Sequence, residues 1–116
     1  MAFAGTGKIW MNGQMVDWKD ATIHVASHVI HYGTGAFEGI RAYDSKTGTN
    51  IFRLEPHMRR MIDSCRVYRM DPPFSQAELE QAVIDTVRVN GFKSCYIRPF
   101  VWRWPCTASP TLPPPA

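Results

Sequence analysis

The sequence predicts an α+β fold in which two helices cover one face of a mainly antiparallel sheet. Short strand-like segments joined by polar turns occupy residues 9–53, and helical periodicity replaces them between residues 56 and 90. One further strand-like segment follows at residues 95–102. Strands that precede the helices, without alternating with them, favour antiparallel pairing over a parallel sheet.

The first strand-like segment, residues 9–16, reads as a hairpin. Its centre is Asn12-Gly13, a pair that supplies the two positive φ angles of a type I′ turn. The next apolar stretch, residues 21–25, alternates only weakly. It fits either a short strand or an irregular lead-in to the residues that follow.

A second hairpin is predicted further along the chain. Residues 36–43 form an apolar run typical of a buried strand, and residues 44–50 form a polar turn. The chain then returns as a strand at residues 51–53.

The first helix is predicted over residues 56–69. Pro56 suits the first helical turn, where its missing N–H costs no hydrogen bond. Apolar side chains then recur at steps of three and four residues, which is the period of a buried helical stripe: Met58, Met61, Ile62, Cys65 and Tyr68. Asp71-Pro72-Pro73 separates this helix from the next.

The second helix begins at a capping box formed by Ser75 and Glu78, in which each side chain accepts a backbone N–H of the other residue. Phe74 and Leu79 are spaced for a hydrophobic staple. A buried stripe is expected from Leu79, Ala82, Val83 and Val87. Asn90-Gly91 can end the helix in a left-handed cap, and the last strand follows at residues 95–102.

Composition narrows the class of protein. The chain has 116 residues, 45% hydrophobic and 20% charged, as expected for one globular domain. No apolar run approaches the ~18 residues that cross a bilayer, and the first residues do not resemble a secretory signal. We therefore expect a cytoplasmic protein with no membrane partner.

Charge and cysteine content exclude further classes. The net charge of +3 comes from 13 basic and 10 acidic side chains, and the arginines are spread over several elements. This distribution favours small anionic ligands and does not predict a nucleic-acid partner. Cys65, Cys95 and Cys106 are odd in number and widely spaced, so we expect free thiols and neither a disulfide framework nor a zinc site.

The most informative motif is the glycine-and-aromatic stretch from Ser27 to Arg41, SHVIHYGTGAFEGIR. Together with FRLEPHMRR at residues 52–60 and YIRP at residues 96–99, it closely resembles the amino-terminal domain of branched-chain amino-acid aminotransferases. That family has fold type IV and uses pyridoxal 5′-phosphate. The resemblance implies the smaller, amino-terminal domain of that fold, and it covers roughly residues 8–103.

The resemblance implies roles for five residues. Arg60 matches the family arginine that contacts the cofactor phosphate. Tyr32, Phe37, Tyr96 and Arg98 match substrate-binding positions, with Tyr32 contributed across a subunit interface and Arg98 receiving the distal carboxylate of glutamate. The implied substrates are the branched-chain amino acids and glutamate or 2-oxoglutarate, and the implied assembly is a homo-oligomer, in the family a dimer.

Three of these residues also have a simpler interpretation. Arg60 alone reads as a solvated helix arginine, Phe37 as a core aromatic, and Arg98 as half of a surface ion pair. Arg59 points about a quarter-turn away from Arg60, so both cannot serve one phosphate equally.

Arg41 lies on the motif strand and could pair with Glu38 or Asp63. The spacing of His24, His28 and His31 invites a metal site, but loop hydrogen bonds explain these residues better, and we predict no metal.

A transaminase of this family also needs the lysine that binds the cofactor aldehyde, and none of Lys8, Lys19, Lys46 and Lys93 matches it. The chain thus offers no catalytic residue. We expect a fragment of a branched-chain amino-acid transaminase that is inactive alone. The alternatives are a non-catalytic small domain that associates with a full-length aminotransferase subunit, or another fold-type IV enzyme, namely a D-amino-acid aminotransferase or an aminodeoxychorismate lyase.

The last segment differs in amino-acid composition from the rest of the chain. We assign residues 1–103 to the aminotransferase class IV amino-terminal domain and residues 104–116, which hold five of the nine prolines, to a tail outside it. Such a segment lacks the periodicity of a packed element, so we expect it to be disordered. The abrupt change suggests an out-of-frame or truncated gene product, and a weaker alternative reads residues 113–115 as a polyproline ligand.

Overall fold

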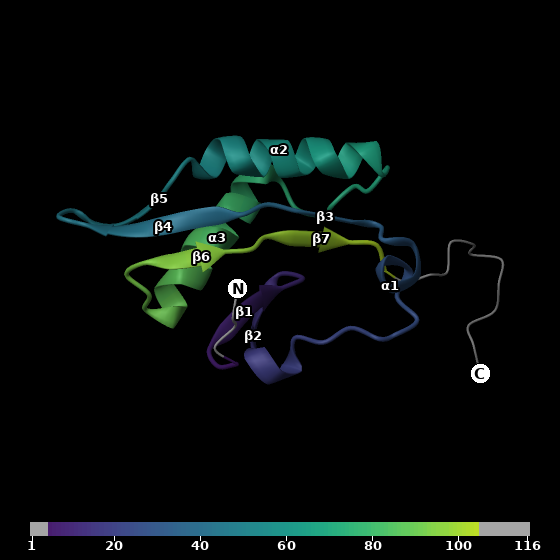
Figure 1. Ribbon diagram of the computed structural model, residues 1–116, viewed down its shortest axis with the longest axis horizontal. Helices are drawn as coiled ribbons and strands as arrows, with labels where there is room; N and C mark the ends of the chain where they lie inside the picture. Colours follow the sequence, from purple (N-terminus) through teal and green to yellow (C-terminus); the bar gives the residue numbers. More distant parts are fainter. Residues whose placement is uncertain (1–4, 105–116) are drawn as a thin grey trace.

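The computed structural model describes residues 5–104. Its elements run β1 (Lys8–Met11), β2 (Gln14–Asp17), a 3-10 turn η1 (Trp18–Asp20), α1 (His28–Tyr32), β3 (Gly35–Phe37), β4 (Ile40–Ser45), β5 (Gly48–Ile51), α2 (Leu54–Val67), α3 (Gln76–Asn90), β6 (Cys95–Ile97) and β7 (Phe100–Trp102). The strands form three small antiparallel sheets, β1-β2, β3-β7 and β5-β4-β6. Figure 1 shows the two long helices against these strands. The α+β class is confirmed, with the sheet in three pieces.

The β1–β2 hairpin is confirmed. Asn12 and Gly13 adopt φ angles of 53° and 91°, and Met11 pairs with Gln14 on either side of them. The hairpin is anchored to the end of α3, because the Asn90 side chain accepts from the Lys8 N–H and donates to the Lys8 carbonyl. Residues 21–24 are irregular, the second of the two alternatives.

The predicted strand over residues 36–43 is broken in two. β3 pairs with β7 and β4 pairs with β6, and the register does not shift across the break: Phe37 lies opposite Phe100 and Ile40 opposite Ile97. Pro99 explains the interruption, because it has no N–H to donate and only accepts, from the Glu38 N–H at 3.1 Å. The predicted strand at residues 95–102 is divided into β6 and β7 for the same reason.

The second hairpin is tighter than predicted. β4 continues to Ser45 and β5 begins at Gly48, so only Lys46 and Thr47 form the turn. The predicted seven-residue polar turn was wrong because polar side chains are tolerated on this exposed ladder, where Tyr43 pairs with Asn50. Residues 52 and 53 are not strand, since Arg53 is the N-cap of α2.

The two long helices match the prediction closely. α2 begins two residues earlier and ends two residues earlier than expected, and Arg69 follows it in the left-handed conformation with φ of 54°. Backbone bonds from Arg69 to the Arg66 carbonyl and from Met70 to the Cys65 carbonyl close this end as a Schellman motif. The Ser75–Glu78 capping box and the left-handed Gly91 cap of α3 are both present.

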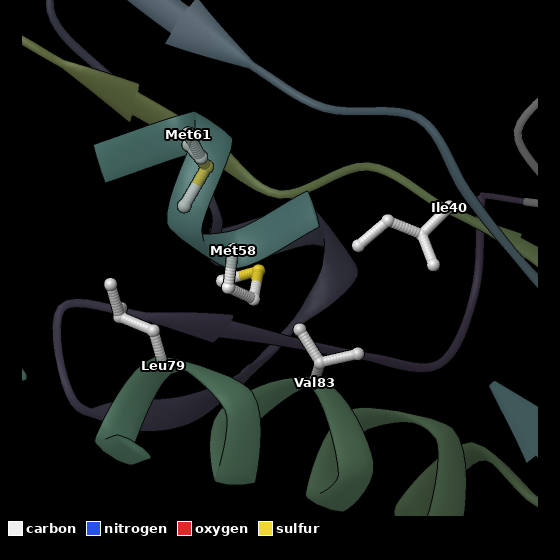
Figure 2. Close-up of a cluster of buried hydrophobic side chains, with 5 residues drawn as sticks. All are labelled: Ile40, Met58, Met61, Leu79 and Val83. Carbon is white, nitrogen blue, oxygen red and sulfur yellow. The ribbon is translucent and has the colours of Figure 1, made fainter. Parts of the chain in front are cut away.

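The core lies between the two helices and the start of β4. Its central side chains are Ile40, Met58, Met61, Leu79 and Val83, and Figure 2 shows α2 and α3 directing theirs toward one another beside Ile40. Phe74 packs against this cluster, as the staple predicts. The predicted stripe of α3 is buried as expected, whereas Tyr68 at the end of α2 stays 48% exposed.

The structure describes two of the three cysteines, and Cys65 lies in a second buried cluster with Ala36 and Met70. Cys65 is buried and Cys95 is half-buried, both are free, and burial raises the pKa of each thiol. Cys106 and the rest of residues 105–116 lie outside the described residues. Within residues 5–104, no helix is both long enough and apolar enough to cross a bilayer.

Candidate active site

The glycine-and-aromatic motif folds into α1, β3 and β4. The short helix α1 ends where Gly33 adopts a left-handed φ of 65°. The three histidines make local hydrogen bonds, as expected: His24 Nδ1 accepts from the Ala26 N–H, His28 Nδ1 bonds Thr34 Oγ1, and His31 Nε2 bonds the Val25 carbonyl. The motif is therefore a braced turn that leads into the strands.

The strand pair β3–β4 against β6–β7 has two different faces. The face toward the helices, the inner face, carries four buried residues: Ala36, Glu38, Ile40 and Ala42. Alternation turns Phe37, Gly39 and Arg41 to the opposite, outer face. These three residues are exposed.

Three of the predicted substrate-binding residues meet on the outer face. Arg98 donates to the Tyr96 hydroxyl from Nη2 at 2.7 Å and from Nε at 3.2 Å. The Arg98 guanidinium also lies 4.2 Å from the centre of the Phe37 ring. We call Phe37, Tyr96 and Arg98 the outer cluster. The spacing argument that placed Tyr96 and Arg98 on one face is confirmed.

Two neighbours shape the outer cluster. A Cβ on Gly39 would lie 2.6 Å from the Tyr96 hydroxyl, so only glycine leaves room for that hydroxyl where it stands. Arg41 lies over the Tyr96 ring, 5.8 Å from its centre. Neither suggested partner of Arg41 is its partner here, because Glu38 binds Arg60 and Asp63 binds Arg66.

Arg60 is held by a buried carboxylate. Its Nη2 donates to Glu38 Oε1 at 2.6 Å, and its Nε donates to Glu38 Oε2 at 2.9 Å. His57, one turn earlier on α2, donates from Nδ1 to Glu38 Oε1 at 2.7 Å. The Arg60 bonds lower the pKa of Glu38 most strongly; burial opposes them and the His57 bond adds to them. In return, Glu38 raises the pKa of Arg60.

The interpretation of Arg60 as a free, solvated arginine was incomplete, since the side chain is 68% exposed and yet ion-paired. Arg59 turns elsewhere and bonds exposed Glu55 at 3.3 Å, as its position on the helix predicts. No role for His57 was predicted from the sequence, although its spacing of three residues from Arg60 places both on one helical face. A carboxylate inside an apolar strand was a second available signal.

The structure does not bring all five predicted site residues together. Among residues 5–104, no hydrogen bond, ion pair or cation–π contact joins Arg60 to the outer cluster. Tyr32 is 69% exposed and lies against His28 and His31 on α1. A hollow of about 520 Å³ lies elsewhere, lined by Ile51, Leu54 and Val87 among others. Phe37, Arg60 and Arg98 are exposed, so the candidate site lies on the surface of the described chain.

The four lysines lie on other segments of the chain than these residues. Lys8 pairs with Asp17 at the first hairpin. Lys19 lies in η1, Lys46 in the β4–β5 turn, and Lys93 between α3 and β6. No group of three or more potential metal ligands occurs within residues 5–104.

Comparison with known proteins gives one consistent result. The family model for amino-transferase class IV matches residues 35–115. The branched-chain-amino-acid aminotransferase of Pseudomonas aeruginosa is 49% identical over 96 residues, which are 83% of this chain and 31% of that protein. The match passes residue 103, and the predicted domain end there stays a prediction.

Solved structures agree. The branched-chain amino acid aminotransferase of Thermoproteus uzoniensis with norvaline is 40% identical, with a TM-score of 0.84 over 93% of this chain and 37% of that one. The Escherichia coli enzyme is 44% identical, with a TM-score of 0.86 over 93% of this chain and 37% of that one. The chain thus spans about a third of these relatives, and it belongs to the class IV aminotransferase family.

Proposed function

We propose that this chain is the amino-terminal portion of a branched-chain amino-acid transaminase, which exchanges an amino group between Leu, Ile or Val and 2-oxoglutarate in branched-chain amino-acid biosynthesis. The outer cluster carries the proposal. It places a guanidinium and a phenol hydroxyl beside an exposed aromatic ring. A surface of this kind can bind a carboxylate at one point and an apolar side chain at another.

The cofactor would be pyridoxal 5′-phosphate. The donor set of Arg60 fits a phosphate, because its bonds to Glu38 use Nε and Nη2 and leave the Nη1 edge for an anion. When bound, the cofactor supplies the electron sink that takes up the electron pair of the substrate α-carbon.

Each residue then has a defined task. Arg60 binds the phosphate and fixes that end of the cofactor. Arg98 binds the distal carboxylate of glutamate, with Tyr96 holding its guanidinium by a hydrogen bond. Phe37 lines the apolar part of the pocket for Leu, Ile or Val.

Tyr32 belongs to a second subunit's site in this proposal. Its 69% exposure, on a helix away from the outer cluster, supports a role across a subunit interface. We include in the proposal a homodimer in the cytoplasm, with residues 1–103 forming the amino-terminal domain and 104–116 lying outside it.

The 116-residue chain is not expected to catalyse the reaction by itself, since no lysine accompanies the site residues. The test is a chimera in which this chain's residues 8–102 replace the aligned segment of the Pseudomonas aeruginosa relative. Leucine-dependent formation of glutamate from 2-oxoglutarate by the chimera, and none by the chain alone, is the expected result. A folded chimera that binds cofactor but transaminates only D-amino acids would overturn the substrate class.

A second candidate is a non-catalytic domain that associates with a full-length aminotransferase subunit. Three aromatic side chains are exposed on the outer face, which favours a surface that binds another protein: Phe37, Tyr43 and Phe100. Co-purification of the chain with a complete class IV aminotransferase, without activity in the chimera, would select this candidate.

A further inference from the structure

Glu38 is an unusual residue in this fold. Its side chain is 5% exposed on the inner face, where its neighbours Ala36 and Ile40 are apolar. Among the described residues, Ser27 is the only other buried polar side chain. A buried carboxylate is costly unless ionic or hydrogen-bonding partners surround it, so its presence here needs an explanation beyond packing.

Both partners of Glu38 come from one face of α2. Oε1 accepts from Arg60 Nη2 and from His57 Nδ1, while Oε2 accepts from Arg60 Nε. The carboxylate is thus held by hydrogen bonds from both residues, and it cannot rotate without losing one of them. His57, with 21% of its side chain exposed, braces Glu38 from the helix side.

The hydrogen bonds to Glu38 fix the orientation of the Arg60 guanidinium. A guanidinium has five N–H donors in one plane. The side-on contact with Glu38 occupies Nε–H and one Nη2 hydrogen, and among residues 5–104 no hydrogen bond uses Nη1. Because the side chain is 68% exposed, the remaining donors face outward, in the geometry that binds two oxygens of a phosphate.

Arg59 supplies a comparison within the same helix. It makes one 3.3 Å bond to Glu55, and both side chains are more than half exposed. A long exposed pair of this kind fixes little. The chain therefore holds one arginine of the adjacent pair firmly and leaves the other loosely held.

We propose that Glu38 is the positioning residue of Arg60: braced by His57, it holds the guanidinium side-on so that the Nη1 edge is presented to an anionic phosphate. This inference rests on the proposed function for the identity of the phosphate, which is that of the pyridoxal cofactor. Glu38 does not touch the cofactor. It restricts the Arg60 side chain before the phosphate binds, so less conformational entropy is lost on binding.

Removing the Glu38 carboxylate has two effects on phosphate binding, and they act in opposite directions. Glu38→Gln leaves Arg60 with an uncompensated positive charge, which by itself would strengthen phosphate binding. It also releases the guanidinium, which weakens binding. We expect release to dominate, because the Arg60 side chain is exposed to water, which weakens the charge effect, and because a free guanidinium must be ordered again when the phosphate binds.

The test follows the Arg60 Nε–H signal in the ¹⁵N-labelled 116-residue chain by NMR. Without ligand, a dispersed, slowly exchanging signal is expected in the wild-type chain and in Glu55→Gln, the matched control. In Glu38→Gln the signal should collapse toward the free-arginine position. A wild-type Arg60 signal that already exchanges like a free side chain would overturn the inference.

The second measurement titrates each chain with pyridoxamine 5′-phosphate, using pyridoxamine as the ligand without phosphate. Glu38→Gln should bind about tenfold more weakly than wild type, and Glu55→Gln should bind unchanged. Equal or tighter binding by Glu38→Gln would refute the positioning role and leave the phosphate contact of the proposed function standing. If the Arg60 Nε–H signal is ordered but does not change when pyridoxamine 5′-phosphate is added, the phosphate contact is refuted. The positioning role is then refuted as well.

Arg60→Lys keeps the test valid if Glu38→Gln does not fold, because it leaves the buried carboxylate and His57 in place. It retains the positive charge and lacks the planar fork. It should bind pyridoxamine 5′-phosphate about as weakly as Glu38→Gln. Wild-type affinity in Arg60→Lys would show that charge alone suffices and would contradict the proposal.

Discussion

The two faces of the strand pair β3–β4 and β6–β7 differ in what completes them. On the inner face, Ile40 is fully buried against Met58 and Met61 of α2 and Leu79 and Val83 of α3. On the outer face, Phe37 remains 56% exposed although it contacts Arg98. Within residues 5–104, the inner-face side chains are buried and most outer-face side chains are exposed.

This difference separates residues that maintain the fold from residues that await a ligand or partner. Inner-face residues have their partners within the described chain, and Glu38 with Arg60 lies at the border, buried at one end and exposed at the other. Outer-face residues contact one another but bury little. Substitutions on the two faces test this separation.

Ile40→Ala should lower the free energy of unfolding by about 3 kcal/mol, because it leaves a cavity at the centre of the core. Urea denaturation measures the effect. The matched outer-face control on the same strand is Tyr43→Ala, with a native side chain that is 51% exposed, and it should change the same quantity by less than about 0.5 kcal/mol. Equal losses would remove the distinction between the faces.

Glu38→Gln should lower the free energy of unfolding by about 1–3 kcal/mol at neutral pH, because a buried acceptor of charged donors is lost. The pKa of folded Glu38 lies below its ordinary value of 4.5, chiefly through its bonds to Arg60. Its stabilising contribution is therefore complete above the unfolded pKa and disappears as the pH falls through the folded pKa.

The difference in urea midpoint between wild type and Glu38→Gln should accordingly shrink as the pH is lowered below 4.5. A difference that stays constant across the acid range would show that the variant acts through packing and not through the ionised carboxylate.

Arg69→Gly should stabilise the helix that covers the inner face, by about 1 kcal/mol. Arg69 adopts a left-handed φ of 54°, which glycine tolerates better, and its backbone bonds to Arg66 and Arg103 do not need its side chain. Thermal unfolding measures the change. Arg66→Gly, inside the same helix, should instead destabilise by about 1 kcal/mol, and a gain there would contradict the conformational explanation.

Gly39→Ala should have the smallest effect on stability, below about 0.5 kcal/mol, because the added Cβ meets the far end of a flexible side chain. It should nevertheless displace the Tyr96 hydroxyl from Arg98. A crystal structure checks this directly. Gly35→Ala, which crowds the Phe100 ring on the same face, is the control that should leave the Tyr96–Arg98 bond intact.

Local signals made much of the fold predictable. Asn12-Gly13 specifies its hairpin and Ser75 with Glu78 specifies a helix start, since each motif acts within four residues. The break between β3 and β4 was missed because its cause, Pro99, lies on the opposing strand. Only the pairing of the two strands brings that missing donor next to residue 38.

The candidate site, like the fold, was predictable only in part. Alternation placed Tyr96 and Arg98 on one face, and the structure joins them. The Glu38–Arg60 pair depends on how α2 crosses the strands, so no spacing within either element revealed it. The tyrosine at position 32 is likewise set on a separate helix, and its predicted role involves another subunit.

The most direct test of the open outer face is a kinetic comparison in the chimera that carries residues 8–102. If Arg98 binds the distal carboxylate, Arg98→Ala should raise KM for 2-oxoglutarate by about 10- to 100-fold, the usual cost of losing a charge-assisted hydrogen bond. KM for leucine should change less than about threefold, because leucine has no distal carboxylate. Equal losses for both substrates, or none for either, would contradict the assignment of the outer cluster as a substrate-binding surface.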